Sequence, residues 1–578
     1  MLFRKMFKIL TVLIGTISLA GIAYGQNLEE IGLKKGVKLN GSVNLNVIGY
    51  HVQGIDQRRD PFNWFLTGSL NVGLFGYSAP LSFSYSNTNK SFSQPFNQFS
   101  FAPSYKWAKA YIGYNSMTFS NYTLAGHIFL GGGVELTPGN WRVSAMYGRL
   151  KKAVPFHLED SLRYHDASYK RMGYGLKLGY ESNGDEISAN IFTAKDDIHS
   201  IPFTLAESQL TPQQNVAFGT KIRKRFFSKF FVEAEYALSV MNTDTRANTS
   251  KDSVGLPSTD NLIKGLLPDN PTSRYYDALN ASLGYHATWY TLQIKYERIS
   301  PEYQTLGAYY FNNDLRNITI VPSVRLLKNT LNLSGNLGLQ ENNLDKTRAS
   351  TTNRFVSAIN VSYLPNELWN LTLNYSNFSS YTNIKPQPDP YFQNELDTLD
   401  FYQISQTMAA TVVRSLGNEK APQSLMLSGT YQEANDQGSY EGGDIESSYV
   451  TINVSYSYAL IPSNTTLAVS GNTYLNNAAG MKSLYWGPTL SASQSFKENI
   501  IKISFASSYN ETSGDNIQKS PILNNRINAS YSPQSKEAAS KTQHNLSLGI
   551  NLLNRLKSTT QQPSFTELTC TFNYAFTF

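Results

Sequence analysis

The sequence predicts an antiparallel transmembrane β-barrel of about 24 strands, with short periplasmic turns and long extracellular loops. Three observations support this: strand-length runs in which apolar and polar residues alternate, turns that alternate between short and long, and an unusual composition. Only 16% of the 578 residues are charged, whereas 13% are aromatic, and soluble domains usually carry roughly 25% charge. The mean hydropathy is nevertheless −0.33. Such a composition is typical of strands with one apolar and one wet face.

The first 25 residues predict a secretory signal peptide. A basic start with Arg4 and Lys5 precedes an apolar run, and Ala23-Tyr24-Gly25 provides small residues for cleavage. A transmembrane anchor is the alternative, but about 20 apolar residues are normally needed to span a bilayer. We therefore expect export, a short periplasmic segment over residues 26–36, and the barrel over 37–578. No intrachain disulfide is expected, because the chain has a single cysteine.

The repeating unit is a hairpin, seen best in residues 174–180 (YGLKLGY), the turn ESNGD, and residues 186–194 (EISANIFTA). Period-two alternation places Tyr174 and Leu178 on one face, together with Ile187 and Ala189 after the turn. Asn-Gly is the strongest short hairpin signal. The same alternation recurs in residues 290–297, 331–340, 369–376, 450–458 and 544–552.

Connection lengths also alternate, as expected for an outer-membrane barrel with its short turns in the periplasm. The short connections lie at residues 137–140, 182–185, 286–289, 327–330, 364–368, 461–464 and 497–499. The long ones lie at residues 151–171, 242–274, 378–400 and 433–447.

Counting gives three strands before residue 89 (about 37–50, 62–76 and 81–88) and about 21 from Leu124 onward. The total of about 24 is expected to lie between 22 and 26. Residues 89–122 do not fit this count, because they contain Pro95 and Pro103 and are rich in aromatics and asparagine. Two interpretations stay open: an inward-folded constriction or plug, or one extra hairpin in the wall.

Other all-β folds also alternate, but they fit less well. A β-sandwich needs two dry inner faces, whereas one face here is Asn, Ser and Thr on nearly every strand. No propeller-like repeat is present. The last strand, near residues 568–578, is expected to pair with the first, near 37–50, so that no sheet edge is left in lipid.

The final residues, LTCTFNYAFTF, resemble the C-terminal signal of outer-membrane barrels that the barrel-assembly machinery binds. Phe572, Tyr574, Phe576 and Phe578 carry this resemblance. The whole chain from residue 37 resembles large Gram-negative outer-membrane barrels, porins and receptor-type transporters among them. Residues 296–315 and 338–354 resemble segments of uncharacterised outer-membrane barrels, and no activity follows from that likeness.

Few motifs carry chemistry. Phosphate-loop, HExxH, CxxC and GxSxG motifs are absent from the sequence, so we expect no enzyme and no cofactor. Metal ligation was weighed for residues 157–166 (HLEDSLRYHD) and for Asp196, Asp197 and His199. A charged surface loop beside lipopolysaccharide is the simpler interpretation of both, so no metal site is predicted.

Two groups of charged residues are candidate sites. One is a set of charges predicted to face the lumen, where they would set ion preference: Glu235, Lys295, Glu297, Arg325 and Lys502. The other is a basic patch around a presumed periplasmic turn, either a solvated turn or a dock for an anionic periplasmic partner: Lys221, Arg223, Lys224, Arg225 and Lys229.

The function expected from the sequence is that of a passive outer-membrane channel for polar solutes or a partner-delivered substrate. The alternative is a structural or interaction barrel that anchors or assembles surface proteins, and an outer-membrane enzyme is a weaker third. Expected neighbours are outer-membrane lipid, lipopolysaccharide and the assembly machinery, with a periplasmic or surface protein as a further partner. The net charge of +7 comes without a basic helix or an RNA-binding motif, so nucleic acid is not expected.

Overall fold

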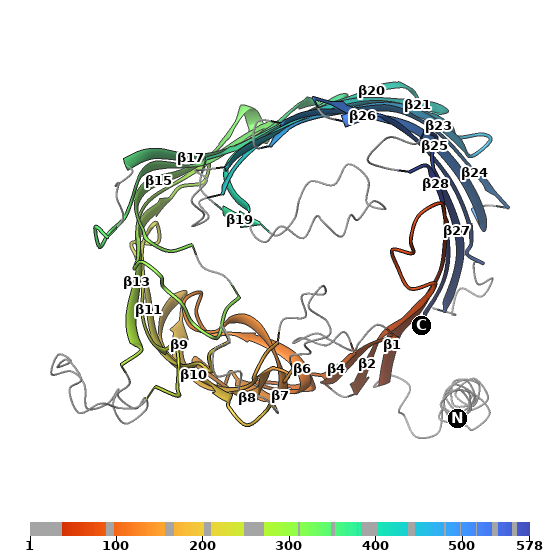
Figure 1. Ribbon diagram of the computed structural model, residues 1–578. Helices are drawn as coiled ribbons and strands as arrows, with labels where there is room; N and C mark the ends of the chain where they lie inside the picture. The colour runs from red at the N-terminus through yellow and green to blue at the C-terminus, as the bar shows by residue number, and fades with distance from the viewer. Residues whose placement is uncertain are drawn as a thin grey trace, which may run out of the picture.

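The computed structural model describes most of the chain from residue 37 onward as one closed antiparallel barrel (Figure 1). The described residues are 37–74, 76–87, 97–155, 167–201, 210–247, 271–309, 312–347, 353–377, 380–382, 402–436, 445–478, 481–497, 499–515, 517–533, 542–557 and 563–578. The proposed signal peptide, the segment 26–36 and the loop 157–166 lie outside the described residues. Asp196, Asp197 and His199 lie within them.

The first half of the wall runs from the N-terminal strand to β14. Its strands are β1 (Val37–Gln53), β2 (Phe62–Leu74), β3 (Tyr77–Ser86), β4 (Gln98–Phe101), β5 (Ser104–Tyr105), β6 (Ala108–Thr118), β7 (Ala125–Leu136), β8 (Trp141–Lys151), β9 (Lys170–Ser182), β10 (Asp185–Asp197), β11 (Gln214–Phe226), β12 (Phe230–Asn242), β13 (Ser273–His286) and β14 (Tyr290–Ile299).

The second half runs on to the C-terminal strand and includes one short 3-10 turn, η5 (Leu327–Asn329). Its strands are β15 (Leu315–Leu326), β16 (Leu331–Asn342), β17 (Asn353–Asn366), β18 (Trp369–Ser376), β19 (Ser380–Thr382), β20 (Tyr402–Asn418), β21 (Ala421–Asp436), β22 (Ile445–Leu460), β23 (Thr465–Ala478), β24 (Met481–Phe496), β25 (Ile501–Gly514), β26 (Ile517–Tyr531), β27 (Gln543–Arg555) and β28 (Phe565–Thr577).

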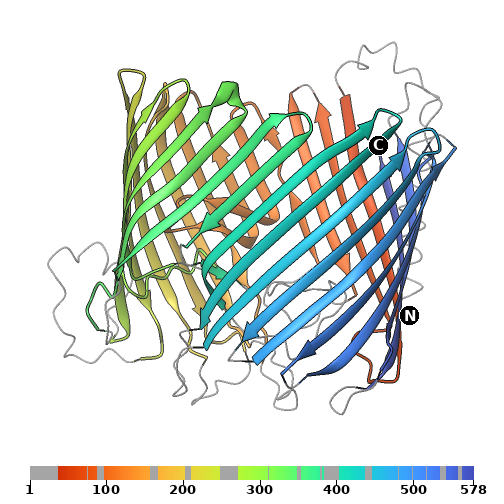
Figure 2. The ribbon, with the colours of Figure 1, turned by 90° about the horizontal axis from the view of Figure 1, so that it is seen from above.

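Among the described residues these 28 segments occupy 26 positions in the barrel. The reason is that β4 and β5 share one position, between β3 and β6, and β18 and β19 share another, beside β20. The predicted range of 22 to 26 is confirmed. Figure 2 shows the tilted strands, with short turns along the upper rim and the opposite strand ends, from which the longer connections begin, along the lower rim. We call these the short-turn rim and the long-loop rim.

The difference between 24 and 26 comes from residues 89–122. The described part of this segment forms a hairpin in the wall, β4–β5 and β6, so the interpretation of the whole segment as a plug is wrong for residues 98–118. Pro103 suggested a break because it has no N–H to donate. It does interrupt the strand, but its carbonyl still accepts a hydrogen bond from the Ala110 N–H (2.8 Å). The sheet therefore continues past it.

Closure is as predicted. β28 pairs with β1 in an antiparallel register from Ser42↔Thr577 to Gln53↔Thr566. The backbone of Phe578 adds two hydrogen bonds to Gly41, of 2.8 and 3.0 Å. The sheet therefore has no open edge at this seam, which is the condition for strands to span a bilayer.

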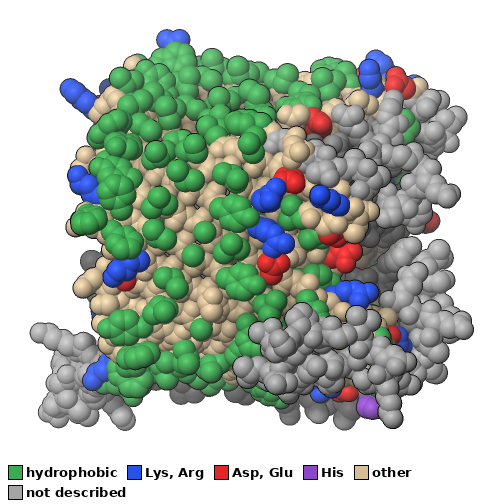
Figure 3. Space-filling view, turned by 90° about the vertical axis from the view of Figure 1, so that its left-hand side faces the viewer, with side chains coloured by type: hydrophobic (Ala, Val, Ile, Leu, Met, Phe, Trp, Pro, Cys, Tyr) green, Lys and Arg blue, Asp and Glu red, His purple; other side chains and the backbone are tan. Residues whose placement is uncertain are grey.

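The outer face of the barrel is apolar. Ile187, Leu339 and Phe355 are 57%, 64% and 59% exposed on it, and Figure 3 shows such side chains spread over the wall around β11–β15. Apolar surface left in water costs about 25 cal/mol per Å², so this face is suited to lipid. Trp141 and Trp289, 57% and 55% exposed beside short turns, lie where an interfacial aromatic girdle is expected. The chain is thus a large outer-membrane β-barrel.

Charge also appears on the outer face, near the long-loop rim. Alternation places Arg298 and Asp277 on the lipid side, where an Arg298 nitrogen lies 2.6 Å from an Asp277 oxygen, and Arg316 pairs with Glu341 nearby. Tyr296 precedes Arg298 on the same face of β14. Tyr275 lies on the other side of Asp277 on the same face of β13, 39% exposed, so the Arg298–Asp277 pair lies among outward tyrosines near the long-loop rim. Within the described ranges, no helix has the length and hydropathy needed to cross a membrane.

Candidate functional site

The inner face of the barrel differs between its two sides. At inward positions on β10, β12 and β13, the side chains of Phe192, Ala237 and Ala278 have no exposed surface. At inward positions on β21 and β24, by contrast, Ser428 and Ser491 are partly exposed. The first side is therefore covered from within, whereas the second faces solvent.

Two connections provide that cover, and we call them together the internal shelf. They are residues 119–124, between β6 and β7, and residues 300–309, between β14 and β15. Figure 1 shows both within the ring beside β6–β13. The Tyr303 hydroxyl donates to the Tyr122 carbonyl (2.6 Å), and the Thr305 hydroxyl donates to the Thr123 carbonyl (3.0 Å). The two halves of the shelf therefore hold each other.

The shelf has its own apolar core. Tyr303 and Leu124 from the shelf, and Phe129 and Phe192 from the wall, belong to one cluster and are each fully buried. Fully burying an aliphatic or aromatic side chain contributes about 1.5–3 kcal/mol relative to leaving it exposed. The shelf is therefore a packed part of the structure and not a loop lying loosely in a water-filled lumen.

Asn215 on β11 anchors the shelf to the wall. Its amide nitrogen donates to the Ser239 hydroxyl (2.8 Å) and to the Val240 carbonyl (2.9 Å). Its amide oxygen accepts from the Leu306 N–H (3.1 Å) and shares the proton of the Thr305 hydroxyl, 3.0 Å away, with the Thr123 carbonyl. The side chain is fully buried, so all of its hydrogen-bonding capacity goes to holding residues 300–309 against β11 and β12.

Three of the predicted lumen charges lie under the shelf. Glu235 accepts a hydrogen bond from the Ser120 hydroxyl. Glu297 accepts one from the Tyr122 hydroxyl (3.1 Å) and lies 3.4 Å from the Lys295 ammonium group. Burial, and next the nearby Glu297 carboxylate, raises the pKa of the Tyr122 phenol, which therefore stays a hydrogen-bond donor. These charges face inward as predicted, but the structure uses them to hold the shelf.

The other two predicted lumen charges lie away from the shelf. Arg325, near the short-turn end of β15, and Lys502, near the short-turn end of β25, are both exposed. Each alternates with outward residues such as Ile503, which is 44% exposed. Both side chains are thus placed on the inner face, and their effect on ion preference stays a prediction.

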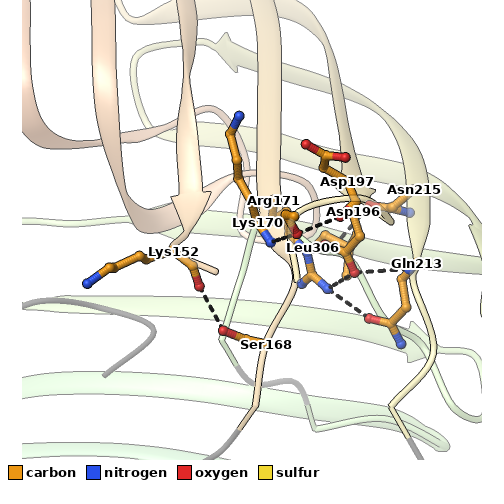
Figure 4. Close-up of polar contacts among 10 residues, drawn as sticks. Lys152, Ser168, Lys170, Arg171, Asp196, Asp197, Gln213, Asn215 and Leu306 are labelled. Atoms are coloured by element: carbon orange, nitrogen blue, oxygen red, sulfur yellow. Dashed lines mark hydrogen bonds and ion pairs between the residues drawn. The ribbon is translucent and has the colours of Figure 1, made fainter. Parts of the chain in front are cut away.

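A buried ion pair braces the wall beside the shelf (Figure 4). The Arg171 guanidinium donates to both carboxylate oxygens of Asp196, at 2.7 and 2.8 Å, and to the Gln213 side-chain oxygen at 3.0 Å. The Gln213 N–H donates to the same Asp196 carboxylate (2.9 Å). Arg171 and Asp196 are 7% and 3% exposed, so this bidentate pair is fully enclosed.

We expect Arg171→Met to lower the stability of the folded barrel by about 3–5 kcal/mol, because it leaves the Asp196 carboxylate buried without its cation. A double variant, Arg171→Met with Asp196→Leu, should recover part of the loss. The measurement is the temperature or urea concentration at which the heat-modifiable folded band disappears on gels. A single variant as stable as the parent would contradict this role, and Arg142→Met, at a solvated pair with Glu181, is the control.

The predicted basic patch surrounds the short turn between β11 and β12 and is largely ion-paired. Lys221 lies 3.4 Å from Glu186 and 3.3 Å from Glu233, and Arg223 lies 3.5 Å from Glu233. Lys224 pairs with Asp185, whose carboxylate also accepts the Arg225 N–H (2.7 Å), and Lys229 is exposed. Most of the positive charge is thus balanced within the hairpins, and docking of an anionic partner stays a prediction.

Metal binding gains no support from the described part of the chain, in which no group of three His, Cys, Asp or Glu side chains could hold an ion. Asp196 is taken up by Arg171, and Asp197 accepts the His199 N–H within its own turn (3.1 Å).

The predicted assembly residues lie on the closing strand. Phe572, 38% exposed, marks the outward face of β28, which Tyr574 and Phe576 share. Tyr574 and Phe576 also contact His544 on β27, through a hydrogen bond of 2.9 Å and a ring contact of 4.7 Å. The placement fits a lipid-facing stripe, and the role of these residues in assembly stays a prediction.

Sequence reasoning offered residues 89–122 as an inward constriction, of which 119–122 belong to the shelf, but it missed the other half, residues 300–309, and a second inward loop, residues 54–61 between β1 and β2. Figure 1 shows this loop inside the ring beside β28. Gly54 permits the inward turn, because its φ is 99° and an added Cβ would lie 2.5 Å from the Ser564 carbonyl oxygen. A usable signal existed for the shelf: alternation stops in SPEYQTLGAY (300–309), within a stretch already noted as barrel-like.

Comparisons with known proteins were made for sequence and for structure. No protein-family model matches the chain, and no curated protein sequence matches it. Among solved structures it is similar to the P pilus usher (PapC) translocation pore, with 12% identity and a TM-score of 0.36 over 93% of this chain and 98% of that one. The FrpB iron transporter from Neisseria meningitidis has 10% identity and a TM-score of 0.37 over 94% and 83%. Pseudomonas aeruginosa OccK9 (OpdG) has 11% identity and a TM-score of 0.29 over 70% and 98%. At these identities and scores the likenesses carry no functional conclusion for this chain.

Proposed function

We propose that this protein is a passive outer-membrane channel for small polar solutes, with a lumen narrowed on one side by the internal shelf. A barrel of this strand number encloses a space wider than that of a 16-stranded porin. The shelf fills part of that space with a packed core, so permeation would follow the opposite wall, formed by β20–β28.

The observation that carries the proposal is the chemistry of that opposite wall. One row of its inner face, read across β21–β25 through the strand register, consists of small residues: Ser424, Ser457, Ala468, Ser491 and Ala506. Each is partly exposed. The three serine hydroxyls of this row can hydrogen-bond water or a passing polar solute, and all five side chains are too small to fill the lumen.

The test is electrical. Purified protein, shown to be folded by its heat-modifiable gel mobility, should produce stepwise current increases in planar lipid bilayers. Liposomes containing it should swell in neutral sugars up to a size limit. Folded protein that inserts but never conducts would contradict the proposal, and a co-purifying surface or periplasmic protein would then favour the scaffold alternative.

A further inference from the structure

Beyond passage of solutes, the strand register brings basic side chains into a line on the open wall. Arg555 on β27 lies opposite Ile522 of β26, Arg526 lies on β26 itself, and Lys502 on β25 lies opposite Ser530 of β26. The three basic side chains therefore lie level with residues 522, 526 and 530 of β26, which are four residues apart along that strand. Successive levels are therefore about 13 Å apart along the strand at 3.3 Å per residue.

All three side chains are on the inner face. Ile527 and Ile503, next to Arg526 and Lys502, are 47% and 44% exposed on the outer face, so alternation turns the two basic residues inward. Arg555 has the same parity as Leu553, and both side chains are buried on the inner side of the wall, at 6% and 1% exposed. We call Arg555, Arg526 and Lys502 the basic track.

The track begins at the loop 54–61. The Arg58 and Arg555 guanidinium carbons lie 4.7 and 4.9 Å from the centre of the Phe565 ring, so one aromatic ring holds both cations. Arg59 lies beside the Tyr50 ring at 5.8 Å. Three guanidinium groups thus meet at the long-loop end of the track beside Glu567 and the loop acids Asp56 and Asp60, so the unbalanced positive charge of the track is that of Arg526 and Lys502.

Negative charge is scarce along this wall. Among the described side chains at inward positions on β21–β28, Glu567 is the one acid, and it lies 4.0 Å from Arg58. The loop adds Asp56 and Asp60, both exposed. Under the shelf, by contrast, two acids, Glu235 and Glu297, lie with one base, Lys295. The side of the lumen left for permeation is therefore the basic side.

Arg526 is the central residue of the track. The register places it at the end of the row of small residues on β21–β25, directly after Ala506, with Asn551 beside it on β27. The Arg526 side chain is partly exposed. A guanidinium also matches carboxylate and phosphate groups with two parallel hydrogen bonds.

We infer that the basic track selects anionic solutes bearing carboxylate or phosphate groups: Arg526 and Lys502 contact the solute along β26 and β25, and the buried Arg555 adds positive potential from β27. This inference rests on the proposed channel function and names its substrate class. A row of like charges on a low-dielectric wall raises the local concentration of counter-ions, and levels about 13 Å apart let one solute move between them without leaving the field of either.

The experiment measures reversal potentials in planar bilayers under a KCl gradient, with citrate as the anionic probe. The parent channel should prefer chloride to potassium, and citrate should partly block its current. Arg526→Gln with Lys502→Gln should lower the anion preference at least about twofold and weaken the block. Arg526→Lys should keep the preference but block less well. Neither test variant touches Arg555, whose packing on Phe565 could affect folding.

The matched control is Arg414→Gln. Arg414 stacks on Trp369 at 5.0 Å on the outer wall, so this variant removes the same charge outside the lumen and should leave selectivity unchanged. A conducting channel that prefers cations, shows no preference, or is unaffected by the double variant would overturn the basic track alone. A folded protein that does not conduct would overturn the channel proposal itself, and the track with it.

Discussion

Asn215→Leu should open the lumen. The substitution leaves the Leu306 N–H without its buried partner and takes one hydrogen bond each from the Thr305 and Ser239 hydroxyls, which keep their bonds to the Thr123 and Gln304 carbonyls. Each buried polar group left unsatisfied costs about 1–3 kcal/mol. The shelf is the part that can respond by leaving its place, because the wall strands are held by continuous ladders.

The expected result is a single-channel conductance that exceeds the parent value, with added current noise as the shelf moves in and out. Adding Tyr303→Phe, which removes the hydrogen bond to Tyr122, should increase the fraction of time spent in the larger conductance state. The barrel itself should still form, so the heat-modifiable gel shift should persist.

Asn472→Leu is the control for this experiment. Asn472 is an inward asparagine on β23, opposite Asn453 and Gly487 in the register, on the wall away from the shelf. It should change conductance little and without added noise. If Asn215→Leu and Asn472→Leu behave alike, or if Asn215→Leu conducts no more than the parent, the shelf is not what narrows the pore.

The strands of the wall were predictable because the residue patterns that specify them are local. The hairpin of residues 174–194 folds as expected, with Ile187 opposite Tyr180 and Ala189 opposite Leu178. Alternation and Asn-Gly turn chemistry act between near neighbours, so they can be identified from one strand at a time. The sequence does not decide between a wall hairpin and a plug for the β4–β6 region, because Pro103 breaks the local alternation. In the structure the neighbouring strands keep the sheet continuous there.

The candidate sites were less predictable because they depend on contacts between distant segments. Tyr122 and Tyr303 are 181 positions apart, and no local pattern pairs them. Alternation predicts that Glu235 and Glu297 face inward. It does not predict that they lie beneath the shelf, because that position results from the packing of the shelf. The alignment of Arg555, Arg526 and Lys502 likewise depends on the stagger between strands, which alternation does not determine.

Removing Phe578 should lower the amount of protein inserted in the outer membrane severalfold. The last residue does two things in the structure: its backbone forms two hydrogen bonds with Gly41, and its ring packs against Phe576 at 5.3 Å. Deletion removes both, so deletion alone does not separate closure of the barrel from recognition of the ring during assembly.

Phe578→Ala separates them, because it keeps the backbone hydrogen bonds and removes the ring. At the rim of the barrel, water can hydrogen-bond to the Gly41 N–H and carbonyl if the two bonds with Phe578 are lost. Losing these two bonds should therefore cost little stability. We therefore expect Phe578→Ala to reduce insertion about as strongly as deletion, measured as folded protein in outer-membrane fractions. Phe505→Ala, at an outward position of β25 that is 45% exposed and outside the predicted assembly residues, should insert nearly normally. Normal insertion of Phe578→Ala would instead assign the effect of deletion to the two backbone bonds with Gly41, and the conductance of whatever protein does insert should match the parent in either case.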